Sequence, residues 1–226
     1  MVLVDGGMDK HGKRLERFVA QHDLGIGAVR AVLLTHAHRD HIGAIVSLLN
    51  RGVDIKVFAS AAEDEVLQGQ RRSEGKLQMV TDRLPGLDAA IPGIETEILE
   101  DGDTISFGDQ LQVKALAIPG HTKGSMGFEI KSSLDGSNVL YAGDALDFTP
   151  SGAKNALWLL SGDTKISNQS IIELTNRIVR EGTEIDAVVP AHSGDAHFNN
   201  LRRYRAAQKP SIPRIHRYSA PRHIAF

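Results

Sequence analysis

Three histidines and one aspartate stand within six positions of the sequence, in the stretch "THAHRDH". They are His36, His38, Asp40 and His41. Neutral imidazoles and carboxylates are the donors that divalent metals bind in hydrolytic sites, where a position stays open for water and substrate. Singly, each residue has an ordinary structural explanation, such as a helix cap for the aspartate. Together they predict half of a metal site, which needs further ligands elsewhere in the chain.

Three more candidate ligands stand alone, each directly after a short apolar segment. His121 follows "ALAIPG", Asp144 follows "VLYAG" and His192 follows "AVVPA". Apolar, β-branched segments of this length are typical of strands. The C-terminal ends of strands are where α/β sheets place their sites, because loops converge there on a rigid base. A purely structural explanation would require seven ligand-type residues to occur in this order by coincidence.

The spacing within the first cluster also indicates its local structure. His36 and His38 alternate, which suits an extended loop, and not the i, i+4 pair of a helical HExxH site. Asp40 and His41 follow at once, at the start of an amphipathic segment that we expect to be a helix. A carboxylate at that position is favoured by the helix dipole.

The elements that must position these residues alternate between strands and helices. Strands are predicted within 1–7, 29–38, 54–60, 111–121, 125–131, 138–144 and 185–192, and "EDGDTISFGDQLQVKAL" predicts two strands joined at "FGDQ". Helices are predicted within 11–23, 40–52, 168–182 and 198–208. The alternation indicates a layered α/β domain. The length of 226 residues fits one domain, 1–226.

Two segments stand apart from this pattern. Residues 61–90 are polar and weakly periodic, and we interpret them as an insertion or lid. The C-terminal tail, 206–226, belongs to a basic stretch that has no acidic residue after Asp195. Charged runs are usually solvated, and the alternative is a surface that attracts an anionic substrate or partner.

Composition excludes several classes of function. The chain is 41% hydrophobic and 24% charged with a formal net charge of −2, which does not favour nucleic acid or a membrane surface as a partner. It has no cysteine, so disulfides, thiolate ligands and a cysteine nucleophile are excluded. No apolar run has the length of a transmembrane helix, and no signal peptide precedes "VLVDGG". We therefore expect a cytoplasmic protein.

The motifs, taken in order, resemble those of the metallo-β-lactamase superfamily. "THAHRDH" is similar to its HxHxDH signature, "PGHTKGSMGF" to its second motif, "YAGDA" to its bridging-aspartate motif and "VVPAHSG" to its last histidine motif. The resemblance extends over almost the whole chain, from "VLVDGG" to "PAHSG". It implies a four-layer αβ/βα sandwich of two packed sheets with helices outside.

The resemblance also implies a complete dinuclear metal site. In that site, His36, His38 and His121 hold the first ion, Asp40, His41 and His192 hold the second, and Asp144 bridges them. Two ions about 3.5–4 Å apart would share a water and supply hydroxide at neutral pH. Asp40 would also orient that hydroxide or accept its proton, which makes it the candidate catalytic residue. All-nitrogen and oxygen ligation favours Zn²⁺, with iron or manganese also compatible.

Thr122 and Ser125 in "GHTKGS" are candidates for hydrogen bonds that orient an imidazole. Turn chemistry explains them equally well. The other histidines have no motif around them and are expected at the surface; they are His11, His22, His197, His216 and His223.

The substrate is the least determined part of the prediction. The GHTxGS form resembles glyoxalase II-like hydrolases, acyl-homoserine lactonases and some class B β-lactamases. Such lactonases often have a tyrosine shortly after the bridging aspartate, where this chain has Asp147 and Phe148. We predict a hydrolase of a small ester, thioester or lactone. The alternatives are a phosphodiesterase or ribonuclease, a β-lactamase, and a non-catalytic binding protein on the same fold.

The start of the sequence departs from the superfamily pattern. Domains of this kind usually begin with a hairpin before the strand that ends in "DxG", which here is within Val2–Gly7. Either an upstream segment is absent or the edge of the first sheet is shortened. An exposed sheet edge invites pairing with another chain, so we predict a homodimer.

Overall fold

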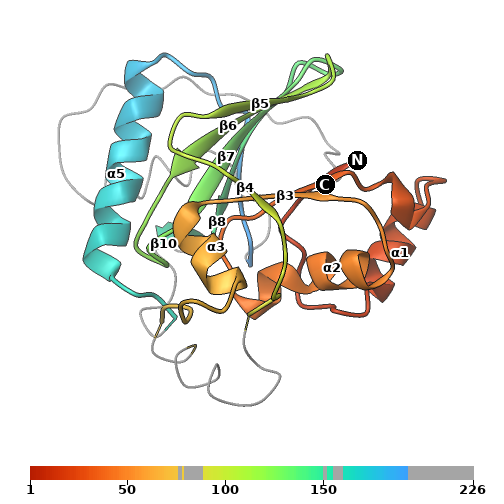
Figure 1. Cartoon of the computed structure of the whole chain (residues 1–226). Coiled ribbons are helices and arrows are strands. Elements are labelled where there is room, and N and C mark those ends of the chain that lie inside the picture. Colours follow the sequence, from red (N-terminus) through yellow and green to blue (C-terminus); the bar gives the residue numbers. More distant parts are fainter. Residues whose placement is uncertain (76–77, 79–88, 150–151, 155–159, 193–226) are drawn as a thin grey trace. The chain divides into compact units, whose positions relative to one another are not determined.

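The structure is a computed structural model that describes residues 1–75, 78, 89–149, 152–154 and 160–192. It divides into two compact units, an N-terminal unit of Met1–Leu99 and a C-terminal unit that begins at Glu100. Each unit has its own sheet (Figure 1). The prediction of one domain over 1–226 stays a prediction.

The N-terminal unit contains a four-stranded parallel sheet in the order β1-β2-β3-β4. Its strands are β1 (Val2–Val4), β2 (Ala31–Leu33), β3 (Lys56–Ala59) and β4 (Thr96–Ile98). Its helices are α1 (Lys13–Ala20), the 3₁₀ turn η1 (Ile26–Ala28), α2 (Arg39–Asn50) and α3 (Ala61–Leu67). Parallel neighbours need crossover connections, and α1, α2 and α3 supply them.

Helix α2 is held to this sheet by one apolar face. Ile42, Ile45 and Leu48 follow the i, i+3 spacing of that face and belong to the same buried cluster as Val32 and Val57. This packing holds α2 against the sheet. It therefore also fixes the first turn of the helix, which carries "RDH".

The C-terminal unit contains a five-stranded sheet in the order β11-β8-β7-β6-β5. Its strands are β5 (Thr104–Phe107), β6 (Leu111–Ala117), β7 (Met126–Ser132), β8 (Asn138–Gly143) and β11 (Ala187–Pro190). Strands β5 to β8 are antiparallel, and β11 runs parallel to β8. A separate hairpin consists of β9 (Asp147–Thr149) and β10 (Gly152–Lys154).

Helix α5 (Thr164–Arg180) covers one face of the five-stranded sheet (Figure 1). Ile171, Leu174 and Ile178 lie on its buried face and belong to one cluster with Leu140 and Val188 from the strands. The Asp163 side chain caps the helix by accepting hydrogen bonds from the first-turn amides.

Most of the predicted elements are observed. Each predicted strand contains an observed one, "FGDQ" joins β5 to β6 as expected, and α1, α2 and α5 fall in predicted helical segments. Strand β4, helix α3 and the β9–β10 hairpin were not predicted. Part of 61–90, the predicted helix 198–208 and the tail 206–226 lie outside the described residues. No helix in the described part of the chain is long and apolar enough to cross a membrane.

Candidate metal centre

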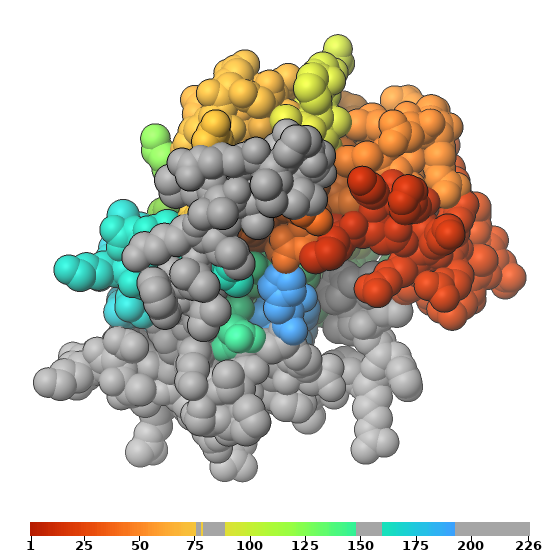
Figure 2. All heavy atoms as spheres, turned by 90° about the horizontal axis from the view of Figure 1, so that it is seen from below, coloured from red at the N-terminus to blue at the C-terminus, as the bar shows by residue number. Residues whose placement is uncertain are grey.

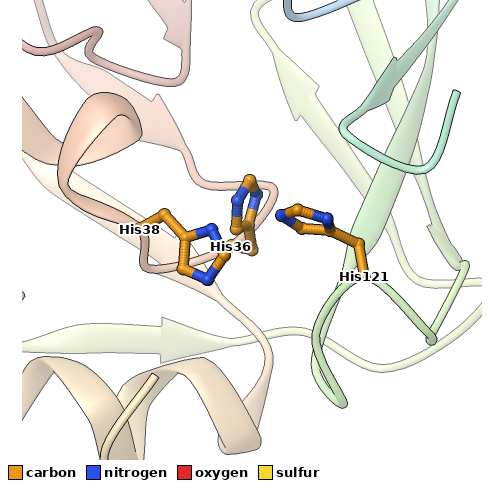
Figure 3. Close-up of side chains that lie close together, drawn as sticks. All are labelled: His36, His38 and His121. Carbon is orange, nitrogen blue, oxygen red and sulfur yellow. The ribbon is translucent and has the colours of Figure 1, made fainter. Parts of the chain in front are cut away.

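The histidine cluster occupies the buried turn between β2 and α2. His36 is 1% exposed, His38 4% and His41 2%, whereas the side chain of Asp40 is 30% exposed. The rings of His36 and His38 meet edge to face with centroids 4.4 Å apart (Figure 3). Burying an imidazole costs free energy unless its nitrogens have hydrogen-bond partners. The partners of these rings therefore indicate the function of the cluster.

Asp5, at the end of β1, controls the ring orientation of two of these histidines. Its carboxylate lies 2.8 Å from His41 Nδ1 and 2.8 Å from the Thr35 hydroxyl, which is itself 3.0 Å from His36 Nδ1. A carboxylate only accepts, so His41 Nδ1–H and the Thr35 hydroxyl both donate to it. The Thr35 proton is then used, and Thr35 Oγ1 accepts from His36 Nδ1–H. When either ring is neutral, its proton is therefore on Nδ1 and its Nε2 is the nitrogen with a lone pair.

His38 has the opposite tautomer. Its Nε2 lies 2.9 Å from the backbone carbonyl of Glu74, which only accepts, so Nε2 carries a proton and, in the neutral ring, Nδ1 does not. The backbone between His36 and His38 is fixed as well. The Ala37 amide donates to the carboxylate of Glu63 at 2.7 Å, and the Ser73 hydroxyl donates to the Ala37 carbonyl at 3.3 Å.

In the neutral form of the rings, the nitrogens that could bind a metal are therefore Nε2 of His36, Nε2 of His41 and Nδ1 of His38. Metal-binding histidines characteristically donate the other ring nitrogen to a carboxylate, hydroxyl or carbonyl, which fixes the ring and raises its basicity. All three rings follow this rule. The residues present fit a divalent metal such as zinc.

In the C-terminal unit, His121 follows β6 in a turn that is tied to the start of α5. The Gly162 amide donates to the His121 carbonyl at 2.8 Å, and the ring nitrogen Nδ1 lies 3.4 Å from the Ser161 hydroxyl. Thr122 and Ser125 close the same turn, because the Ser125 hydroxyl accepts from the Thr122 amide and lies 2.7 Å from its hydroxyl. Turn chemistry thus accounts for these two residues, and their predicted contact with an imidazole stays a prediction.

Asp144 follows β8, and His192 follows the neighbouring strand β11. One carboxylate oxygen, Oδ2 of Asp144, lies 3.5 Å from His121 Nε2 and 3.3 Å from His192 Nε2. His121 is fully buried, whereas the His192 side chain is 53% exposed. One carboxylate oxygen therefore lies close to the ring nitrogens of two predicted ligands.

Gly120→Ala is expected to destabilise the protein and displace His121. At the Gly120 φ of +131°, an added Cβ would lie 2.2 Å from the backbone nitrogen of Ser167 in α5. Overpacking of this kind costs about 1–3 kcal/mol. Thermal unfolding measures the loss. Gly136→Ala is the matched control, since Gly136 also has a positive φ, +72°, but nothing within 4 Å of its Cβ. Equal losses in the two variants would contradict the role of the close approach.

Several residues of the site were not predicted from the sequence. Asp5 stands after an apolar strand in "VLVDGG", which is the same signal that identified Asp144, and it could have been found in that way. Glu63 gave no signal, because it lies among other acidic residues in "AAEDE". Of the remaining histidines, His11 and His22 are exposed as predicted. His197, His216 and His223 lie outside the described residues.

The fold and these ligand clusters define a metallo-hydrolase. The family model described as "Metallo-beta-lactamase superfamily" matches residues 1–192. The chain therefore belongs to the metallo-β-lactamase superfamily, and it has the fold of that family. Among solved structures, it is similar to MEM-A1, a subclass B3 metallo-β-lactamase from a soil metagenome library. The TM-score is 0.61 and the identity 24%, and the match covers 92% of this chain and 74% of the other.

Two curated relatives differ in how much of the chain they match. A hydroxyacylglutathione hydrolase from Vibrio cholerae is 31% identical over 129 residues, which are 57% of this chain and 36% of that protein. The chain thus spans about a third of the length of that relative. A Bacillus subtilis protein named "Probable metallo-hydrolase YflN" is 28% identical over 89% of this chain and 78% of its own length.

Proposed function

We propose that the protein is a dinuclear metal-dependent hydrolase of a small thioester, ester or lactone. The two sets of side chains described above would combine into one centre. His36, His38 and His121 would hold one ion, Asp40, His41 and His192 the other, and Asp144 would bridge them. The observation that carries the proposal is the set of hydrogen bonds that orients each ring of the N-terminal unit, because metal-binding histidines are characteristically held in this way.

Asp40 and the metal ions would have different roles in the reaction. When bound, a pair of divalent ions lowers the pKa of water and polarises the bond under attack. Asp40 is the proton acceptor of the proposal, because it is the ligand of the N-terminal unit whose side chain is partly open to water. Its Oδ2 lies 3.8 Å from His41 Nε2, so it can bind on the same side as that ring. Zinc is the expected metal, and iron or manganese also suits this donor set.

A glutathione thioester is the substrate that the comparisons favour. The relatives at 31–33% identity are named hydroxyacylglutathione hydrolases, whereas the structures of β-lactamases are less similar in sequence and support only the fold. No described contact favours a phosphodiester. We also propose that two chains pair along the sheet edge at β1. The proposed location of the protein is the cytoplasm.

Metal analysis and a substrate panel test the proposed function. The purified protein should contain two ions per chain and hydrolyse a hydroxyacylglutathione with kcat/KM above about 10⁴ M⁻¹ s⁻¹, the lower range for enzymes on their own substrates. A lactone, a chromogenic cephalosporin and a phosphodiester should react more slowly. Chelation should abolish turnover, and added Zn²⁺ should restore it. Two bound ions without turnover of any substrate would overturn the proposal and favour a binding protein.

A further inference from the structure

Met8 is a strongly exposed apolar residue in the loop that joins β1 to α1. Its side chain is 64% exposed. Single exposed apolar side chains are common on protein surfaces and need no function. The main chain of Met8 makes this residue of interest, because the loop lies directly on α2, whose first turn carries Asp40 and His41.

The loop is hydrogen-bonded to the first turns of α2. The Gly6 amide donates to the carbonyl of His41 at 2.5 Å, and the Gly6 carbonyl accepts from the Ala44 amide at 2.9 Å. The Gly43 amide donates to the Gly7 carbonyl at 2.7 Å. Three backbone hydrogen bonds therefore fix the residues before Met8 against the turn that carries two of the proposed metal ligands.

Gly43 shows which face of α2 the loop covers. A Cβ on Gly43 would lie 2.6 Å from the Gly7 carbonyl oxygen, 2.6 Å from the Asp9 nitrogen and 2.7 Å from the carbonyl carbon of Met8. Only glycine permits so close an approach. Residues three apart in a helix share a face, so the direction in which Gly43 meets the loop is also the direction in which Asp40 projects, one turn earlier.

The other end of the loop is equally fixed. The Asp9 carboxylate accepts hydrogen bonds from the His11 amide at 3.1 Å and the Arg14 amide at 2.9 Å, at the start of α1. The N-terminal residues, red in Figure 2, reach the molecular surface. Met8 therefore combines a main chain held between hydrogen-bonded neighbours, against the helix face one turn from Asp40, with an exposed thioether side chain.

We propose that Met8 binds the apolar acyl part of the substrate. This inference rests on the proposed hydrolase function and specifies the substrate class further, as thioesters or esters whose acyl chain extends beyond two carbons. Methionine suits such a contact because its unbranched side chain adapts to irregular apolar groups. The acyl chain would cover the side chain that is exposed in its absence.

Methyl NMR of methionine tests the contact without turnover. The chain has only four methionines, so ¹³C-methyl labelling gives few signals, and Met8→Leu assigns the one from residue 8. Hexanoate, a product-like probe, should shift the Met8 signal in the zinc-loaded protein, and acetate should not. An unmoved Met8 signal in saturating hexanoate overturns the inference, whether or not any thioester is hydrolysed. Absence of turnover with a shifted signal would overturn only the proposed function.

Kinetics give a second measurement. Met8→Ala should raise KM about five-fold for a hexanoyl thioester, as expected for the loss of one or two methylene contacts, and leave KM for the acetyl thioester unchanged. Met8→Leu should restore the wild-type value. Leu134→Ala is the control, because Leu134 is 73% exposed and lies in the turn before β8, whereas Asp144 follows the other end of that strand. A KM change independent of chain length contradicts the proposal.

Discussion

Asp144→Asn is expected to lower kcat/KM by more than about 100-fold and to reduce the metal content of the purified protein. Loss of a hydrogen-bond partner behind a metal ligand already costs about 10- to 100-fold, and loss of a bridging ligand should cost more. The oxygen Oδ2 of Asp144 lies within 3.5 Å of two imidazoles, His121 and His192. An amide keeps the shape of the side chain but removes the negative charge that two cations would share. Initial rates and elemental analysis measure the two effects.

Asp147→Asn provides the control for this experiment. Asp147 lies in β9, three residues further along the chain, and is only partly buried. The same chemical change there should leave metal content and rate unchanged. Full metal loading and activity in Asp144→Asn would show that Asp144 is not a bridging ligand. His121→Ala should reproduce the loss of metal and turnover with the fold largely intact.

Asp5→Asn is expected to weaken metal binding and lower turnover by about 10- to 100-fold, although we assign no metal to Asp5. Its carboxylate accepts from His41 directly and holds His36 through Thr35. An amide has only one accepting oxygen. If that oxygen takes the place of Oδ2, its NH₂ group faces the Thr35 amide that Oδ1 now accepts, and if it takes the place of Oδ1, His41 Nδ1–H loses its acceptor, so either orientation weakens the hold on the rings. Asp5 is thus a positioning residue. Competition with a chelator measures the affinity, and ¹⁵N NMR of the histidine rings reports which nitrogen carries the proton.

The backbone at Asp5 decides the choice of variant and control. Asp5 has a φ of +58°, a conformation that asparagine tolerates better than most residues. Asp23 has a φ of +56° and is exposed, so Asp23→Asn tests the same backbone change away from the histidines. Thr35→Val should affect His36 while sparing the Asp5–His41 pair. Unchanged metal affinity and ring protonation in Asp5→Asn would contradict the positioning role.

The proposed ligands could be found from the sequence because their signal is local. An apolar strand followed within a few residues by histidine or aspartate is visible at His121, Asp144 and His192, and the structure places each at the end of a strand. The alternation of His36 and His38 likewise predicted the extended turn before α2.

The partners of those ligands could not be found in this way, because they are set by tertiary contacts. Asp5 precedes Thr35 by thirty positions, and only the parallel pairing of β1 with β2 brings them together. Helix α3 looked irregular because its sequence is polar. The Ser60 cap at its start and the burial of Leu67 in the core make it a helix, and its Glu63 then reaches the Ala37 amide.

The shortness of β1 has a kinetic consequence. Strand β1 has three residues and pairs, among the described strands, with β2 alone, yet it ends at the carboxylate that orients two imidazoles. Short edge elements open locally at a far lower free energy than global unfolding requires. Each opening of β1 would release Asp5 and loosen His41 while the rest of the sheet stayed folded. The rate at which a bound metal ion exchanges would then depend on the rate at which β1 opens.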